Sequence, residues 1–383
     1  MSDAADGESV SGATDDEGPA VLVLSGHRTE KLVDPLETTG EAITTVTNTA
    51  DGLAGRFVGV LRDGIRHARS EEVDVVVGDH GGVVGFAAAI LGTLFGLPVV
   101  IRIGGEIWQI NREKAAEFRA DGEYGQYALI SAFRAMNWFT FRRAEGFLVL
   151  TDHLAVLTVQ ETGCDPRAVR VVGVPIDVDA YQEASGGDAR EALSIEESTV
   201  VTTVTNLRFR GKYEGVRRTL PAVERLLDAH PDTAFVVAGD GRYREQLLDD
   251  IDERFDAETR ERIYVPGFVD DVRSLYAAST VVCYVSFIDG FGNVVREGQA
   301  AGKPVVTNDG YGMREQVEDG VTGVLVDADA DAVFTAVDDL LTDPDRRAAL
   351  GEAGLESVTE RGDTERVGRG LYDAIVDLVR RAR

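Results

Sequence analysis

The residues best suited to chemistry stand between two predicted strands, within residues 281–307. The loop after the first strand supplies Asp289, Gly290 and Gly292, and the helix that follows supplies Glu297. Open α/β sheets bind their ligands at this position, beyond the carboxyl end of a strand. Backbone N–H groups at a helix start, freed of side-chain bulk by the glycines, suit a phosphate, and carboxylates accept hydrogen bonds from hydroxyls. The stretch could therefore hold a sugar hydroxyl, a phosphate and a ribose in one place.

The length of the chain indicates the number of domains, and its charge limits the partners that it could bind. The 383 residues are long for one hydrophobic core, so two domains are expected. Asp and Glu number 67 against 39 Lys and Arg, for a net charge of −28, and only four of the basic residues are lysines. An acidic, lysine-poor surface is typical of proteins from a halophilic cytoplasm, although an ordinary acidic protein has the same balance. The charge excludes general nucleic-acid binding, which needs a basic face.

Neither the cysteines nor the most apolar stretch indicates a metal site or a membrane span. Cys164 and Cys283 have no metal-binding spacing, and Cys283 falls in a predicted buried strand. Residues 81–101 carry no charge and are long enough to span a membrane. Five glycines and Pro98 divide them into a helix and a strand instead, as in a buried layer of an α/β domain. With no signal peptide, a cytoplasmic protein is expected.

Two series of alternating strands and helices predict two Rossmann-like domains with parallel sheets. In the first series the expected strands are 20–24, 42–46, 73–77, 99–103, 146–150 and 168–172, and the clearest helices are 53–69, 83–95, 126–143 and 152–162. In the second the strands are 200–204, 234–238, 263–265, 281–285, 305–306 and 323–326, and the helices are 213–229, 243–255, 272–278, 293–301, 330–341 and 344–361.

The expected domain boundaries follow from an acidic tail, a break in the strand and helix pattern, and a final helix. Residues 1–18 are small and acidic and predict a disordered tail, and the polar, glycine-containing sequence within 175–198, where the pattern breaks, predicts the domain junction. The domains are then 19–177 and 178–363. Residues 364–383 predict one amphipathic helix that packs back on the first domain.

Five motifs in the second domain resemble those of the retaining family-4 glycosyltransferases of the group 1 type, which have the GT-B fold. They are, in order, VTNLRFRGK at 204–212, AGDG at 238–241, VPGFV at 265–269, the paired acids Asp289 and Glu297, and AAGKPV at 300–305. The resemblance covers most of 200–330 and, more loosely, 73–180. It implies two Rossmann-like domains that face a central cleft, with the donor, a nucleotide-diphosphate sugar, bound by the second.

The resemblance assigns the donor side of the site. Lys212, one of four lysines, would stabilise the charge of the leaving diphosphate. The family's arginine is replaced by Asn206, so the second cation would be Arg208 or Arg210, unless both are ordinary exposed arginines. Asp289 would contact the donor sugar in place of the usual, longer glutamate. The other implied donor contacts are Gly239, Gly241, Phe268, Gly290, Phe291, Gly292, Asn293, Val294 and Glu297.

Two of these residues could also serve a structural purpose. Glu297 would hold the ribose hydroxyls, the alternative being an exposed helix glutamate. Asp289 stands just before a helix and could cap it. Asn293 could cap the helix equally well, which would leave Asp289 free for the site.

The acceptor side has a weaker pattern. The family often has a histidine after the strand equivalent to 99–103, where this chain has Gly104, Gly105 and Glu106. His80, after the preceding strand, points to the same cleft and is either a site residue or a structural loop histidine. These four residues are the candidates for contact with the acceptor or the sugar.

The resemblance predicts an enzyme that moves a sugar to a glycan or lipid-linked acceptor with retention of configuration and without a metal. A sugar-nucleotide epimerase and an inactive, nucleotide-sugar-binding subunit are the alternatives. Residues 133–143 mix aromatic residues with arginines. They could form a lipid-facing helix at the inner membrane face or a core-packed one.

Overall fold

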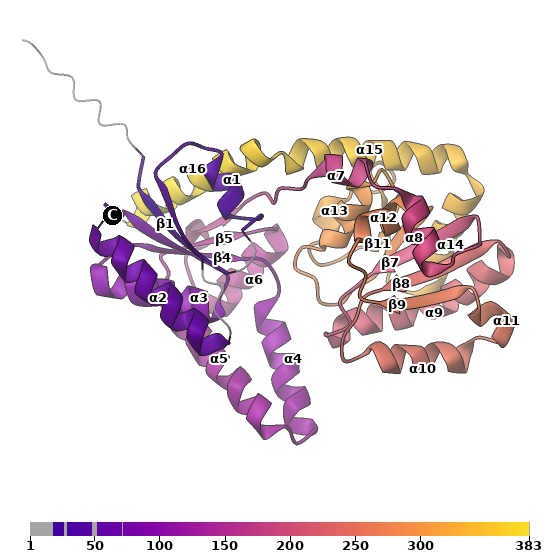
Figure 1. The fold of residues 1–383 in the computed structure, drawn as a ribbon, viewed down its shortest axis with the longest axis horizontal. Helices are drawn as coiled ribbons and strands as arrows, with labels where there is room; N and C mark the ends of the chain where they lie inside the picture. Colours follow the sequence, from indigo (N-terminus) through magenta and orange to yellow (C-terminus); the bar gives the residue numbers. More distant parts are fainter. Residues whose placement is uncertain (1–17, 27–28, 48–51, 71, 383) are drawn as a thin grey trace, which may run out of the picture.

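The fold consists of two parallel sheets, each covered by helices and lying side by side (Figure 1). It is seen in a computed structural model that describes residues 18–26, 29–47, 52–70 and 72–382. The first sheet has the order β2-β1-β3-β4-β5-β6. Its strands are β1 (Val21–Ser25), β2 (Ile43–Thr47), β3 (Val75–Asp79), β4 (Val99–Ile103), β5 (Gly146–Val149) and β6 (Val169–Val171). Its helices are α1 (Val33–Glu37), α2 (Leu53–Ser70), α3 (Gly82–Phe95), α4 (Ile107–Ala120), α5 (Tyr124–Arg143) and α6 (Asp152–Thr162).

The second sheet has the order β12-β11-β10-β7-β8-β9 and its own hydrophobic core. Its strands are β7 (Thr199–Val204), β8 (Thr233–Ala238), β9 (Ile263–Gly267), β10 (Val281–Tyr284), β11 (Val305–Asn308) and β12 (Val324–Val326). The helices from the junction onward are α7 (Val178–Gln182), α8 (Gly186–Leu193), α9 (Arg210–Ala229), α10 (Arg244–Arg254), α11 (Ala257–Arg260), α12 (Val272–Ala278), α13 (Asn293–Ala300), α14 (Ala330–Thr342), α15 (Pro344–Gly362) and α16 (Thr364–Ala382).

The predicted fold, with two Rossmann-like α/β domains, is confirmed, and each expected strand is present with its ends shifted by at most two residues. Residues 175–198, where the junction is predicted and no helix was expected, contain two short helices. Helices α7 and α8 form there and pack on α12, where Ala189 is buried. Helix α4 was also not expected, because only Ala115 on it is buried and the apolar periodicity is correspondingly weak.

The chain crosses between the domains twice. The first crossing follows β6, and the second lies between α15 and α16, which run along one edge of both domains (Figure 1). At this place Ile176 N–H donates to Gly362 O at 3.1 Å. Helix α16 then buries Leu371, Ile375 and Leu378 in the core of the first domain. The last helix is thus part of the first domain's core.

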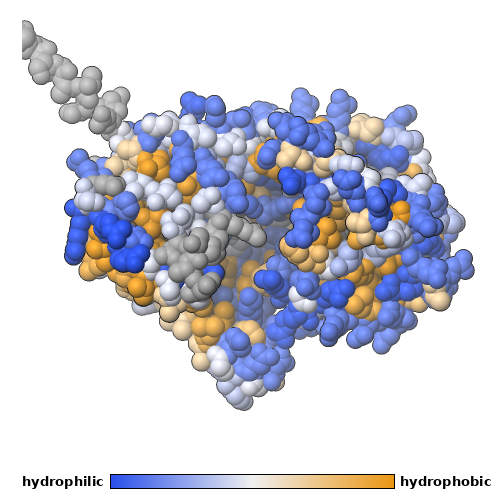
Figure 2. Space-filling view, viewed as in Figure 1, coloured by the Kyte–Doolittle hydropathy of each residue, from blue (hydrophilic) through white to orange (hydrophobic). Residues whose placement is uncertain are grey.

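Contacts also join the domains on both sides of the hollow that separates them (Figure 2). On one side Arg242 bridges Glu117 at 3.0 Å and Asp121 at 2.9 Å, at the far end of α4. On the other side Thr151 Oγ1 donates to Gly290 O at 2.8 Å. The carboxyl ends of both sheets therefore face each other at close range.

Two further predictions concern the ends of the chain and the membrane. The predicted tail, residues 1–18, lies outside the described residues except for Gly18. Among the helices of the described chain, none is long and apolar enough to cross a membrane.

Candidate functional site

A cavity of about 420 Å³ opens at the carboxyl ends of β7, β8 and β10. It brings together many of the residues that the sequence assigned to the donor. The predicted residues in its lining are Arg208, Lys212, Gly239, Phe268, Asp289, Asn293 and Val294. Asn206, Asp240 and Val272 also line it. The ring of Phe268 is 74% exposed, so it stands at the rim with a free face. Such an exposed aromatic face suits stacking against a planar base.

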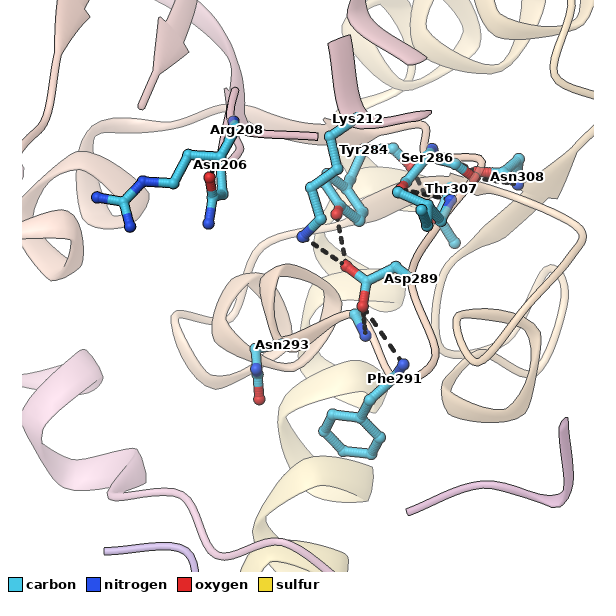
Figure 3. A network of polar contacts seen from close by, with 12 residues as sticks. Asn206, Arg208, Lys212, Tyr284, Ser286, Asp289, Phe291, Asn293, Thr307 and Asn308 are labelled. Atoms are coloured by element: carbon cyan, nitrogen blue, oxygen red, sulfur yellow. Dashed lines mark hydrogen bonds and ion pairs between the residues drawn. The ribbon is translucent and has the colours of Figure 1, made fainter. Parts of the chain in front are cut away.

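Lys212 and Asp289 form an ion pair inside this cavity (Figure 3). Lys212 Nζ lies 2.9 Å from Asp289 Oδ2, and Tyr284 O–H donates to the same oxygen at 2.6 Å. Lys212 is on the first turn of α9, Tyr284 is at the end of β10, and Asp289 is in the loop that follows. Three separate elements thus fix one cation at the wall of the cavity.

The charges of this pair follow from its environment. Burial alone would lower the pKa of Lys212, but the charges of Tyr284 and Asp289 raise it above its usual value. Burial likewise opposes ionisation of Asp289, yet Lys212 and the Tyr284 hydroxyl hold the pKa of this carboxyl below its usual value. Both groups are therefore charged at neutral pH.

Neither Asp289 nor Asn293 caps helix α13, so the expectation that Asn293 could serve as the cap is wrong, and Asp289 Oδ1 bonds only the backbone just before the helix. Asp289 Oδ1 accepts from Gly292 N–H at 2.9 Å and from Phe291 N–H at 3.4 Å. The N-cap position itself is occupied by Gly292, at φ +78°, and Asn293 makes no capping bond. A residue with a Cβ is strained at that φ, which explains the glycine.

Gly239 and Gly241 allow two loops to lie in contact beside the cavity. A Cβ on Gly239 would lie 1.6 Å from Thr205 O, and one on Gly241 would lie 2.3 Å from Leu207 C. The loop after β8 can therefore pack against the loop after β7 only if both positions are glycine. Gly239 lines the cavity, whereas Gly241 supports the loop from behind.

Glu297 lies outside the cavity lining, one turn after Val294 on α13. Its Oε2 accepts from Tyr276 O–H at 2.8 Å, and the Tyr276 side chain is fully buried. Burial raises the pKa of this carboxyl, against the effects of Tyr276 and of Lys31, Lys212 and Arg296. The predicted ribose contact is thus positioned by a tyrosine but does not itself face the described cavity.

The remaining predicted donor residues face elsewhere. Arg210 is exposed and lies 3.8 Å from Glu214. Gly290 packs against Leu154 of the first domain, and Phe291 is buried in the core of that domain. Gly290 and Phe291 thus join the domains, and neither they nor Arg210 line the cavity.

In the first domain His80 belongs to a polar cluster at the ends of β3 and β4. Asp79 Oδ1 lies 2.7 Å from His80 Nδ1 and accepts from Arg102 Nη1 at 2.9 Å. Burial opposes ionisation of Asp79, but His80 and Arg102 lower its pKa to about 2. His80 has φ +71°, and its ring lies against Gly104, so these two predicted residues are neighbours.

Glu106 pairs with a histidine that sequence reasoning missed. His153 Nε2 lies 2.5 Å from Glu106 Oε1, and Glu106 is only 3% exposed. Glu315, from the other domain, accepts from the backbone N–H groups of Asp152 and His153 at 2.6 and 2.8 Å. His153 closely follows the end of β5, a position that the strand pattern could have indicated.

Tyr284 and Tyr276 were also missed, because they are buried aromatic residues that the strand and helix patterns fully explain. Among the described residues no group of three His, Cys, Asp or Glu side chains is placed to hold a metal ion.

A known protein family matches the second domain of the chain. Residues 188–357 match the family described as "Glycosyl transferases group 1". These residues form a group 1 glycosyl transferase domain. The group 1 part of the prediction is thereby confirmed for the segment that holds the cavity, Lys212 and Asp289.

Curated relatives with glycosyltransferase names match part of the chain. A "D-inositol 3-phosphate glycosyltransferase" of Corynebacterium kroppenstedtii is 30% identical over 57% of this chain and 50% of the relative. A "GDP-mannose-dependent alpha-(1-6)-phosphatidylinositol monomannoside mannosyltransferase" of Mycolicibacterium smegmatis is 34% identical over 47% of this chain and 50% of that protein. The chain spans about half the length of the curated relatives that it matches.

The similarity of the whole fold extends further than that of the sequence. The crystal structure of Anabaena Alr3699/HepE in complex with UDP and glucose has a TM-score of 0.69 and covers 93% of this chain and 99% of its own, at 17% identity. A glycosyltransferase from Rickettsia africae has a TM-score of 0.68 over 95% of this chain and 99% of its own, at 12% identity. Both domains therefore share the fold of these proteins.

The different positions of Arg208 and Arg210 in the transferase domain lead to a prediction. Arg208 lines the cavity, and its guanidinium points away from Lys212 (Figure 3). Arg210 lies outside the lining. We expect Arg208→Gln to weaken the binding of a nucleoside diphosphate by about tenfold, the value of one charge-assisted hydrogen bond, and Arg210→Gln to change it less than twofold, roughly. Isothermal titration calorimetry with UDP and GDP measures the affinity of both variants. Equal losses of affinity in Arg208→Gln and Arg210→Gln would contradict the assignment of Arg208 to the donor cavity.

A second prediction concerns His153. The hydrogen bond to Glu106, followed by the charges of Glu106 and Glu315, raises the pKa of His153 although burial opposes the shift. A pKa raised in the folded state stabilises the fold fully below the unfolded value of about 6.5, and this contribution is lost as the pH rises through the folded pKa. We expect His153→Gln to lower Tm more at about pH 5.5 than at about pH 9. An equal loss at both pH values would show that the imidazolium contributes nothing.

Proposed function

We propose that the protein transfers a sugar from a nucleotide-diphosphate sugar to a glycan or lipid-linked acceptor, with retention of configuration. The observation that carries this proposal is the Lys212–Asp289–Tyr284 arrangement in the wall of the 420 Å³ cavity. It supplies a fixed cation beside open space that Asn293 and Val294, at the start of α13, also line. A diphosphate that leaves as the sugar–oxygen bond breaks needs such a cation near its developing charge.

Each part of the cavity has a role in this reaction. Lys212 and Arg208 neutralise the diphosphate, and the exposed face of Phe268 stacks with the nucleotide base. Asp289 fixes Lys212 and accepts hydrogen bonds from the sugar hydroxyls, and Glu297 reaches the ribose when the donor is bound. The residues around Glu106 and His80 complete the acceptor side, with the domain contacts excluding water.

We further propose that transfer needs no metal, since Lys212 and Arg208 supply the positive charge that a bound cation would supply. Full activity in EDTA is the expected result. A loss of activity that Mg²⁺ or Mn²⁺ restores would reject this part of the proposal.

The acceptor is the less defined substrate. The named relatives act on D-inositol 3-phosphate or on a phosphatidylinositol monomannoside, and we propose an acceptor of this phosphorylated-polyol or lipid-linked kind for this chain. The side chain of Trp138 on α5 is 63% exposed, which supports peripheral contact with the cytoplasmic face of a membrane. Flotation with liposomes tests this contact, and failure to float would reject it.

Thermal-shift and turnover assays with a panel of nucleotide sugars test the proposed function. The donor should raise Tm by mass action, and the acceptor should then be consumed with release of a nucleoside diphosphate. A change at C2 of the sugar without any acceptor would instead indicate an epimerase. Binding of the donor without turnover, even as slow hydrolysis, would indicate an inactive subunit. The glycosyltransferase names of the relatives favour neither alternative.

The net charge of −28 supports a second proposal, that the protein works in concentrated salt. The mutual repulsion of the carboxylates destabilises the fold when it is unscreened, and the Debye length falls from about 10 Å at about 0.1 M to about 3 Å at about 1 M salt. We expect Tm and transfer to rise as KCl is raised to about 1 M and beyond. A Tm that falls over this range would contradict it.

A further inference from the structure

A second cavity, of about 270 Å³, lies at the crossing between the two domains. Thr151 and Val174 line it from the first domain and its connection to the second, and Arg296, Gln316 and Arg361 line it from the other side. It shares no lining residue with the 420 Å³ donor cavity in the described parts of the chain. It is therefore a separate site, built from both domains.

Arg296 is the unusual residue in this cavity. It is 7% exposed, and its Nη2 is buried without a hydrogen-bond partner among the described residues. Its guanidinium lies over the ring of Phe291, at 5.5 Å from the centroid. Burial, with the charge of Arg361, lowers the pKa of Arg296 to about 10. A buried guanidinium with an unused N–H group is costly unless an anion accepts from it.

The charge of Glu297 favours the ionised form of Arg296, but no described carboxylate accepts a hydrogen bond from Arg296 Nη2. Glu315 lines the cavity, but both of its oxygens accept from the backbone N–H groups of Asp152 and His153. Glu297, next to Arg296 on α13, accepts from Tyr276. Two arginines thus face a space in which the one carboxylate among the described lining residues is committed elsewhere.

The cavity also offers an acceptor for a hydroxyl group. Gln316 Nε2 donates to Gly292 O at 3.1 Å, whereas its Oε1 is buried with no partner in the described structure. A ligand that combines an anionic group with a hydroxyl donor would satisfy both Arg296 and Gln316. Phosphate monoesters and hydrogen phosphate have this chemistry.

We propose that this cavity binds a phosphate-bearing anion through Arg296 and Arg361, and that the bound anion holds the two domains in the arrangement seen here. Because the lining comes from both domains, binding is tighter when they are together than when they are apart. A ligand shifts a conformational equilibrium by the ratio of its two affinities. The anion is thus an effector of domain closure, at a site distinct from the donor cavity.

The test is a thermal-shift titration of the full chain with inorganic phosphate and, separately, with glycerol 3-phosphate, at constant ionic strength. We expect saturable stabilisation of the unsubstituted protein, no shift for Arg296→Met, and a half-saturating concentration about tenfold higher for Arg361→Gln. The matched control is Arg366→Gln, an exposed arginine on α16 that pairs with Glu360, which should respond as the unsubstituted protein does. Tighter binding of the ester than of inorganic phosphate would identify a phosphorylated metabolite as the source.

Lys212→Met separates this proposal from the proposed transferase function. If the stabilisation persists in Lys212→Met and disappears in Arg296→Met, phosphate acts at the crossing. If it disappears only in Lys212→Met, phosphate binds in the donor cavity and the proposal is overturned. The absence of any shift in the unsubstituted protein also overturns it. Should Arg296→Met fail to fold, the Arg361→Gln titration decides instead, and a half-saturating concentration unchanged by that substitution overturns the proposal.

Discussion

Replacement of Lys212 by methionine should lower kcat for sugar transfer by about 10²- to 10³-fold, the usual effect of removing one fixed group that stabilises developing charge. Lys212 is the cation that the donor cavity holds most rigidly, through Asp289 and the end of β10. The loss should appear in kcat more than in the KM of the acceptor, because the charge on the diphosphate grows as the bond breaks. Steady-state kinetics with the identified donor measures it.

Two further variants separate catalysis from folding. Lys212→Met leaves Asp289 half-buried and unpaired, which can cost about 3–5 kcal/mol. Lys212→Met/Asp289→Asn removes both charges, so it should regain stability and remain inactive. Lys303→Met is the matched control, since Lys303 Nζ donates to Ala277 O, outside the cavity lining. Turnover near normal in Lys212→Met would reject the site.

Substitution of Asp289 should have the next largest effect on sugar transfer. The variants Asp289→Asn and Asp289→Glu should change different properties. Asp289→Asn removes the charge that fixes Lys212, and we expect kcat to fall by about 10²-fold. Asp289→Glu keeps the charge but lengthens the side chain by one methylene. We expect it to move the preference between two donor sugars by about tenfold or more in kcat/KM, the usual discrimination for one methylene. Competition between pairs of nucleotide sugars measures this ratio.

The neighbouring tyrosines provide the control for Asp289. Tyr284→Phe removes the hydroxyl that donates to Asp289 at 2.6 Å, at a cost of about 1–3 kcal/mol for the buried acceptor. Tyr276→Phe makes the same change beside Glu297. If donor preference changes in Tyr276→Phe but in neither substitution at the Asp289 position, then Glu297, not Asp289, selects the sugar.

The sequence predicted the fold well because the strands of both sheets are short apolar runs with helices between them. Such patterns indicate which residues are buried, and residues of the predicted strands lie in the cores of both domains. Helices α4, α7 and α8 were missed for the same reason. Helix α7 buries no residue, and α4 and α8 bury only one alanine each, so their periodicity is weak.

The site was predicted less completely, because spacing gives the position of a residue but not the direction of its side chain. Lys212, Asp289 and Arg208 meet in one cavity, as the motifs implied. Phe291, in the same motif, turns the other way and joins the core of the first domain. No sequence pattern could have paired Glu106 with His153, since the two stand on different strand ends and meet only when the sheet is formed.

The position of α16 has a consequence for the biosynthesis of the protein. Val367, Leu371 and Ile375 complete the core of the domain that is made first, yet they are made after the rest of that core. The second domain has all of its strands and its own core before that happens. Domains usually finish folding in the order of synthesis. Here the core of the first domain is complete only once α16 has been made, so until then the apolar surface that α16 covers has no partner from that helix.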